Sequence, residues 1–437
     1  MPAHDFISRV HATDPDAIVV GAGVAGLTAA AALTAQGLHV QVLEATERVG
    51  GRMATRELDG FRLDLGGHLL NTAYPELARH LDLDRLDLRP LAPGVLVHSS
   101  GRTYRVGDPQ LTPARQAATR SPLGTPLDRA RLASALTRLA ATPAPRLLSR
   151  QETTAARALV DRGLPGRTVD GFLRPLLAAL LSDPTLGTSS RVADLVLRAY
   201  ALGRLCIPAA GIGAVPAQLA ARLPEGTVRF GVHVTSVGTD GVETAAHGRI
   251  RARAVVVATD AATATTLLPG LRQPGFHPVT TYYHAANRSP LGEPVLLLDA
   301  ERTGISHSLV LSDADPSYAP DGRALIATTV LGRRAFDSGG PAGDEPVVRR
   351  RLSELYGTST TAWEFLTVRH APDAVVSMPP PHHFRRSVRL LAGLYACGDH
   401  RDTGTLQGAI ASGRRAASAV LRDLGVRTEP EVVEAAA

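Results

Sequence analysis

The sequence predicts an α/β protein in which a parallel sheet with flanking helices alternates along the chain with an antiparallel sheet and a helical cap. Two observations support this prediction. Short, mostly apolar runs at 17–20, 40–43 and 254–257 are typical of buried parallel strands, and a helix-like run follows the first of them. Helix-like patterns separated by prolines fill much of 91–204, whereas strand-like apolar runs recur within 271–389.

The first predicted strand runs directly into a glycine-rich turn. Gly21 permits the tight turn, Gly23 lets the backbone approach a pyrophosphate, and Gly26 lets the next helix pack closely on the sheet. The N-terminus of that helix offers free N–H groups and a partial positive charge to phosphates. Glu44 ends the second strand, where it can accept hydrogen bonds from ribose hydroxyls. This pattern predicts a Rossmann-like dinucleotide site, which we expect to include Val24, Ala25 and Ala45.

Further motifs extend from this segment to the far end of the chain. They are Arg48-Val-Gly-Gly-Arg52, Asp64-Leu-Gly-Gly67, Ala254-Val-Val-Val-Ala-Thr-Asp260, Leu394-Tyr-Ala-Cys-Gly-Asp399 and Gly404-Thr-Leu-Gln-Gly-Ala-Ile-Ala-Ser-Gly413. In kind and order they resemble the FAD-dependent amine oxidoreductase superfamily. This family includes monoamine and polyamine oxidases, protoporphyrinogen oxidases, phytoene desaturases and hydroxysqualene dehydroxylases. The resemblance implies that the cofactor is FAD, and no residue indicates a covalent attachment.

The resemblance also implies which residues bind FAD. It places Arg52 along the diphosphate, Val234 at the adenine, and the helix that starts near Gly404 at the flavin ring. Asp399 is implied as a hydrogen-bond partner of the ribitol or diphosphate region, with a helix cap or a turn as the alternative. The remaining implied contacts are Gly50, Gly51, Gly66, Gly67, His68, Ala258, Thr259, Gly398, Thr405, Leu406, Gln407 and Ala409.

The resemblance further implies two domains, each made of separated segments. An FAD-binding domain is expected from 15–90, 205–270 and 390–425. A substrate-binding domain is expected from 91–204, the helical cap, and 271–389, the antiparallel sheet that forms the floor of the substrate chamber. Residues 1–14 and 428–437 are expected to be flexible termini. The clearest patterns predict helices at Arg129–Leu139, Glu152–Arg162 and Ser189–Leu202, and strands at Val295–Leu298 and Ala324–Val330.

Two histidines follow turns that approach the flavin in the family. His68 follows the Gly66–Gly67 turn, and His400 follows Asp399. Because imidazole exchanges a proton near neutral pH, both are candidate catalytic acids or bases. The alternative for each is a backbone hydrogen bond or packing at the edge of the site.

The run Tyr282-Tyr283-His284 lies on a predicted strand. Alternation places Tyr282 and His284 on one face and Tyr283 on the other. Packing within the sheet is the default expectation for this run, and the alternative is that Tyr282 and His284 line the substrate site. His382 and His383 are adjacent but have no partner at a useful spacing, so no metal site is predicted.

The absence of lysine among the basic residues helps to predict the substrate class. All 47 are arginine, so the chain lacks the lysine that holds a water at the flavin in the amine oxidases, and Leu406 replaces their cage tyrosine. The resemblance therefore favours the desaturase and dehydroxylase branch. We predict two-electron (hydride) oxidation or desaturation of a mostly apolar small molecule, such as a natural-product or isoprenoid-type intermediate. The alternatives are amine oxidase-type C–N oxidation with a modified site, a non-redox flavin-dependent isomerase and a non-catalytic FAD-binding protein.

Composition limits the classes of partner. The chain is 44% hydrophobic and 20% charged, which is typical of a soluble globular protein. Its arginines are scattered, so no nucleic-acid partner is expected from the net charge of +6. No apolar run is long enough to span a bilayer, and two cysteines do not make a disulfide framework, so we expect a cytoplasmic protein. The expected partners are a small-molecule substrate, O2 or another oxidant, and a second copy in a homodimer.

Overall fold

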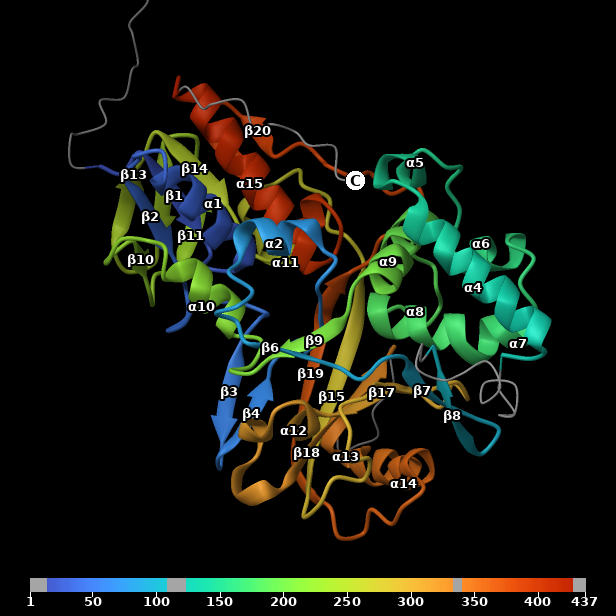
Figure 1. The fold of residues 1–437 in the computed structure, drawn as a ribbon. Helices are drawn as coiled ribbons and strands as arrows, with labels where there is room; N and C mark the ends of the chain where they lie inside the picture. Colours follow the sequence, from blue (N-terminus) through green and yellow to red (C-terminus); the bar gives the residue numbers. More distant parts are fainter. Residues whose placement is uncertain (1–13, 108–122, 333–339, 427–437) are drawn as a thin grey trace, which may run out of the picture.

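The computed structural model describes residues 14–107, 123–332 and 340–426. These residues form a mixed α/β fold with a parallel sheet and a larger, mainly antiparallel sheet (Figure 1), so the predicted α/β class is confirmed. Apart from Asp14, the termini that we expect to be flexible, 1–14 and 428–437, lie outside the described residues. The division into two domains stays a prediction.

The parallel sheet gathers strands from three separated parts of the chain. In spatial order it contains β10 (Val228–Arg229), β2 (Val40–Leu43), β1 (Ala17–Val20), β14 (Ala254–Val257), β21 (Leu394–Ala396) and the antiparallel edge strand β20 (Arg389–Leu391). All residues of β1 and β14 are buried. Both faces of the central strands are therefore covered, which explains why these strands are apolar at every position.

Helices α1 (Val24–Thr34) and α15 (Leu406–Asp423) pack against one another beside this sheet (Figure 1). Three shorter elements lie near them: α2 (Pro75–His80), α10 (Ala214–Ala220) and the 3-10 helix η4 (Asp399–Arg401). Helix α11 (Ala261–Leu267) packs on the opposite face of the sheet. Three small antiparallel sheets complete this part. They are β11 (Val234–Val237), β12 (Gly241–Thr244) and β13 (Gly248–Arg251); β3 (Thr55–Leu58) and β4 (Phe61–Asp64); and β5 (Leu70–Asn71), β9 (Leu205–Pro208) and β6 (Leu88–Pro90).

The larger sheet has seven strands and is antiparallel except where β16 meets β7. Its order is β19 (Glu364–Val376), β15 (Phe276–Ala286), β18 (Ala324–Leu331), β17 (Ile305–Val310), β16 (Leu297–Asp299), β7 (Val95–Ser99) and β8 (Arg102–Val106). The strand predicted at Val295–Leu298 thus begins two residues later, as β16. Helices α13 (Gly340–Gly343) and α14 (Glu345–Tyr356) lie beside this sheet, and α12 (Leu311–Ala314), η2 (Pro316–Tyr318) and η3 (Pro320–Gly322) connect β17 to β18.

The helical cap lies beyond the other side of this sheet (Figure 1). It contains α4 (Pro126–Ala141), α5 (Ala144–Leu148), α6 (Ala155–Asp161), α7 (Gly166–Thr168), the π-helix η1 (Val169–Leu173), α8 (Arg174–Leu181) and α9 (Ser190–Leu202). The helix predicted at Glu152–Arg162 begins later, because the Thr154 hydroxyl accepts from the backbone N–H of Arg157 and caps α6. Ser189 caps α9 in the same way.

Candidate active site

The glycine-rich turn leaves open space in front of its middle glycine. Gly21 has φ +103°, and a Cβ there would lie 3.1 Å from the Ala258 carbonyl oxygen. A Cβ on Gly26 would collide with the Gly21 carbonyl oxygen. A Cβ on Gly23, by contrast, would meet no atom within 4 Å. The fold itself therefore requires Gly21 and Gly26, whereas Gly23 leaves space at the N-terminus of α1 that a ligand can occupy.

Glu44 is fixed beside this turn by hydrogen bonds. Its Oε2 accepts from the backbone N–H of Ala22 at 2.8 Å, and its Oε1 accepts from the backbone N–H and hydroxyl of Thr46 at 2.9 and 2.8 Å. Ala45 lies next to it in the same loop and is exposed. A carboxylate has about four acceptor positions, so Glu44 retains capacity for a ligand hydroxyl.

Two further motifs, Arg48–Arg52 and Asp64–Gly67, meet next to the glycine turn. Gly50 donates its backbone N–H to the Ala22 carbonyl oxygen at 2.8 Å, which brings the Gly50–Gly51 pair alongside Gly23. A Cβ on Gly66 would collide with the Arg52 carbonyl oxygen, so the Asp64–Gly67 turn lies directly on this segment. The glycines of these two motifs, which the resemblance implies as contacts of one cofactor, therefore lie close to one another in the fold.

Arg52 and Asp399 form an ion pair at the same place, with 2.8 Å between Nη2 and Oδ2. Burial raises the pKa of Asp399, but the charge and hydrogen bond of Arg52 outweigh it and hold the pKa below its usual value. The other oxygen, Asp399 Oδ1, is buried and has no hydrogen-bond partner within the described ranges. A buried acceptor of this kind fits a hydroxyl donor on a ligand, such as those of ribitol.

The other predicted cofactor residues lie at several places in and beside the parallel sheet. Thr405 caps α15 by accepting from the Gly408 N–H at 3.1 Å, so Leu406, Gln407 and Ala409 occupy its first turn. The Ala258 N–H donates to the Val20 carbonyl oxygen at 2.8 Å, which places Ala258 and Thr259 at the carboxyl end of the parallel sheet. Val234 is buried in a cluster with Val20 and Leu43. Gly398, with φ +141°, links β21 to η4.

Asp64 and His68 form a buried pair at the end of β4. His68 Nδ1 lies 3.3 Å from Asp64 Oδ2. Asp64 Oδ1 accepts from the Thr55 hydroxyl at 2.7 Å and from the Ile212 N–H at 2.9 Å. Because an ionised carboxylate can only accept, this geometry assigns the proton of neutral His68 to Nδ1. Its Nε2 is then an acceptor, and it is buried without a hydrogen-bond partner in the described part of the chain.

The strand that carries the three aromatic candidates presents a different residue to His68 than we expect from the sequence. Tyr283 donates its hydroxyl to the Asp64 carbonyl oxygen, and its ring lies edge-on to His68 with 6.0 Å between centroids. Tyr282 and His284 share the opposite face, where Tyr282 donates to the Pro341 carbonyl oxygen and His284 Nε2 lies 2.9 Å from Glu345 Oε1. The predicted alternation is present, but Tyr282 and His284 pack towards α13 and α14. Tyr283 is thus the residue of this run that contacts His68, and Tyr282 and His284 pack against the helices beside the sheet.

His400 lies in a different environment. Its ring packs against Gly398, and both ring nitrogens are buried without a hydrogen-bond partner among the described residues. Burial lowers the pKa of His400 to about 4, and the charge of Arg401 acts in the same direction. The ring is therefore neutral near pH 7. This environment favours packing at the edge of the site, so we assign His400 no proton transfer.

His382 gives a prediction about acid stability. Burial lowers the pKa of His382 to about 4, below the value near 6.5 of an unfolded chain. The folded form then binds fewer protons, so its stability is fully present above about pH 6.5 and falls as the pH drops towards 4. The loss from this residue at pH 5 is about 2 kcal/mol. Urea unfolding of His382→Gln should show a smaller difference between pH 7.5 and 5 than the wild type.

The control for this prediction is His39→Gln, because His39 is exposed. It should keep the wild-type difference between the two pH values. If His382→Gln loses as much stability on acidification as wild type and control do, the account of His382 is wrong.

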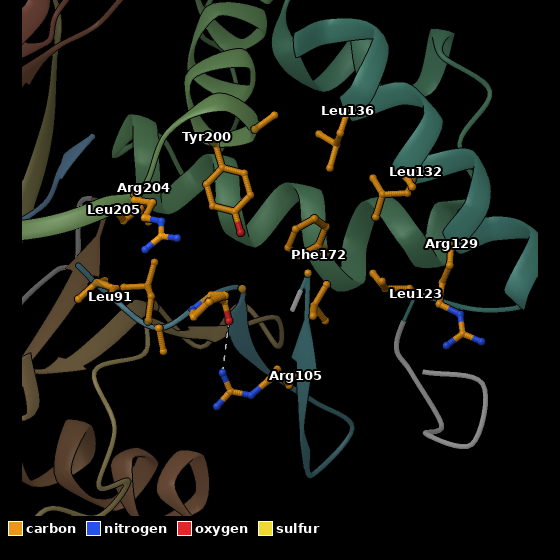
Figure 2. Close-up of a pocket in the computed structure, with 18 of the residues that line it drawn as sticks. Leu91, Arg105, Leu123, Arg129, Leu132, Leu136, Phe172, Tyr200, Arg204 and Leu205 are labelled. Atoms are coloured by element: carbon orange, nitrogen blue, oxygen red, sulfur yellow. Dashed lines mark hydrogen bonds between the residues drawn. The ribbon is translucent and has the colours of Figure 1, made fainter. Parts of the chain in front are cut away.

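A cavity of about 660 Å3 lies between the cap and the β7–β8 hairpin (Figure 2). Apolar side chains such as Leu132, Leu136 and Phe172 line it, and the side chains of Arg105 and Arg204 lie on the other side. None of the residues implied for FAD lines this cavity. We therefore treat it as separate from the candidate site.

Other kinds of chemistry find little support. Burial raises the pKa of the Cys206 thiol to about 11 and that of Cys397 to about 12, so neither is a ready nucleophile. In the ranges that the structure describes, no three His, Cys, Asp or Glu side chains are grouped so that they could hold a metal ion. The helices described there are also too short or too polar to cross a membrane.

Comparison with known proteins gives the family. Residues 24–421 match the family of flavin containing amine oxidoreductases. The chain is 46% identical over 71 residues to putrescine oxidase from Kocuria rosea, a segment that spans 16% of this chain and 15% of that protein. It is 29% identical to hydroxysqualene dehydroxylase from Rhodopseudomonas palustris over 92% of this chain and 97% of that one.

Solved structures show the same fold at low sequence identity. A putative protoporphyrinogen oxidase from Exiguobacterium has a TM-score of 0.71 at 17% identity, over 95% of this chain and all of that one. The family match covers most of the chain and brings a flavin cofactor and oxidoreductase activity with it. The chain therefore belongs to the flavin containing amine oxidoreductase family and is a flavoprotein oxidoreductase.

Proposed function

We propose that the flavin is FAD and that it binds without a covalent bond. Three features support FAD as the flavin: the open space at Gly23, the capacity of Glu44 to accept from ribose, and the buried, unpartnered Oδ1 of Asp399. Arg52 supplies positive charge between these features, where a diphosphate would need it. When bound, FAD supplies a two-electron acceptor for hydride, and the protein contributes binding, orientation and electrostatics.

We propose that the enzyme removes a hydride and a proton from a mostly apolar small molecule, by oxidation or desaturation. The observation that carries this proposal is the buried Asp64–His68 pair. His68 Nε2 accepts the proton that leaves the substrate, and Asp64 stabilises the imidazolium that forms. Tyr283 packs against the His68 ring and holds the Asp64–Gly67 turn on the sheet. Proton uptake at Nε2 therefore needs no movement of the backbone.

The apolar substrate class has support from sequence and relatives. The chain lacks lysine and has Leu406 where amine oxidases place an aromatic residue. One relative that aligns over most of both chains is described as a hydroxysqualene dehydroxylase. The shorter match to putrescine oxidase keeps amine oxidation as the alternative function. The division into an FAD-binding and a substrate-binding domain, the oxidant and a homodimer remain parts of the proposal.

Anaerobic reduction of the bound flavin tests the proposed reaction. Purified holoenzyme is mixed without oxygen with terpenoids, polyenes and primary amines, and the visible flavin absorbance is followed. We expect terpenoids or polyenes, and not amines, to bleach it. Bleaching by amines alone would establish the alternative function, and peroxide release on admitting air would identify O2 as the oxidant. A protein that takes up no FAD would refute both proposals.

A further inference from the structure

Four polar residues form one row across the inner face of the large sheet. Thr281 on β15 lies opposite Thr329 on β18 and Arg369 on β19, and Thr329 lies opposite His307 on β17. Residues opposite one another on neighbouring strands point to the same face. We call Arg369, Thr281, Thr329 and His307 the polar row. Its neighbouring row on the same face contains Tyr283, Ala327 and Leu309 and is mainly apolar.

The polar row lies beside the Asp64–His68 turn. Arg369 donates Nε–H to the Leu65 carbonyl oxygen at 2.6 Å, which fixes one end of the row to this turn. At the other end, burial and the nearby His68 lower the pKa of His307 to about 3, so His307 is neutral at ordinary pH. A β-bulge between Ile305 and His307 shifts the register there. The row therefore lies close to the proposed proton acceptor.

The hydroxyls in the middle of the row have no partner. Thr281 is 7% and Thr329 is 5% exposed, and neither hydroxyl has a hydrogen bond within the described residues. The opposite face differs: the Thr328 hydroxyl lies 2.9 Å from that of Ser308, which accepts from the Tyr356 hydroxyl at 2.8 Å. Neither hydroxyl oxygen is among the fully enclosed polar atoms that lack a partner, so both remain accessible to a ligand. The threonine hydroxyls of the polar row thus lack the hydrogen-bond partner that Thr328 has on the opposite face of the sheet.

We propose that the polar row binds a neutral oxygen group of the substrate, a hydroxyl or a carbonyl. This inference rests on the proposed function and narrows its substrate class. Threonine hydroxyls and a neutral imidazole can each donate or accept, which suits such a group. An ammonium group fits poorly, because Arg369 is positive and the Asp64 carboxylate already has its own donors. A carboxylate on the substrate would gain little binding energy from Arg369, because Arg369 is exposed and water screens the charge of its guanidinium group.

Matched ligands test this directly on the FAD-loaded enzyme. Geraniol, geranylamine, geranic acid and 2,6-dimethyl-2,6-octadiene share one carbon skeleton, and each is titrated while the oxidised flavin spectrum is recorded. We expect geraniol to bind about tenfold more tightly than the hydrocarbon, the effect of one net hydrogen bond. Thr329→Val should remove this preference, and Thr329→Ser should retain it.

Thr328→Val is the matched control, because it makes the same change one residue away on the opposite face. It should keep the preference for geraniol. Equal affinity for alcohol and hydrocarbon, tightest binding of the amine or the acid, or no spectral response to any ligand would each overturn the inference. Those results leave FAD binding intact, whereas failure of the proposed function would appear as no FAD uptake or as flavin bleaching by amines alone.

Discussion

Replacement of His68 with glutamine should lower the rate of flavin reduction by about 10²- to 10⁴-fold, the usual contribution of a positioned general base. Glutamine can still donate to Asp64, which accepts from His68 Nδ1 in the structure. It cannot take up a proton, so the loss should fall on the chemical step. The measurement is the rate at which the flavin absorbance is bleached without oxygen. The substrate is a terpenoid or polyene that bleaches the wild-type enzyme, at saturating concentration.

His284→Gln is the control for this variant, because His284 is also a buried histidine beside a carboxylate, but on the opposite face of the sheet. It should reduce its flavin at the wild-type rate. The flavin spectrum of His68→Gln should be unchanged, which separates a catalytic loss from a loss of cofactor. If His68→Gln reduces its flavin as fast as the wild type does, His68 is not the base that accepts the substrate proton.

Replacement of Gly23 with alanine should weaken FAD binding by about 100-fold, the effect of roughly 3 kcal/mol of overpacking. The new methyl group would meet no protein atom within 4 Å, and Gly23 already has an ordinary φ of −74°. The apoprotein should therefore fold normally. The loss arises because the methyl group occupies space that we assign to the cofactor. Titration of apoprotein with FAD, followed by flavin fluorescence, measures it.

Gly166→Ala provides a matched control, since a Cβ there also meets nothing within 4 Å and α7 lies in the helical cap. It should bind FAD as the wild type does. Thermal unfolding of both apoproteins should show that neither change damages the fold. Wild-type FAD affinity in Gly23→Ala would mean that the cofactor does not occupy the space in front of this turn.

Much of the cofactor site is predictable from sequence because its constraints are local. A strand, a glycine turn and a helix follow one another within 17–34. A side chain at position 21 or 26 would lie too close to backbone atoms, so both positions need glycine. The ion pair between Arg52 and Asp399 is different, since it joins positions far apart in the chain. The resemblance implies both residues as FAD contacts, but only the fold shows that they meet.

The substrate side is less predictable because it depends on which face of a sheet is covered. Alternation separates Tyr282 and His284 from Tyr283, but the sequence does not show that α14 packs on the face of the first two. Thr281, Thr329 and His307 are likewise unremarkable in their own strands. They form a row only through strand register and the bulge before His307.

The cofactor content of the purified protein tests the central claim most directly. The purified protein should be yellow and show the absorbance spectrum of oxidised flavin. Acid denaturation should release stoichiometric FAD into the supernatant, since the bond is not covalent. A colourless protein that takes up no FAD when reconstituted, or one that binds a different dinucleotide in its place, would contradict the account.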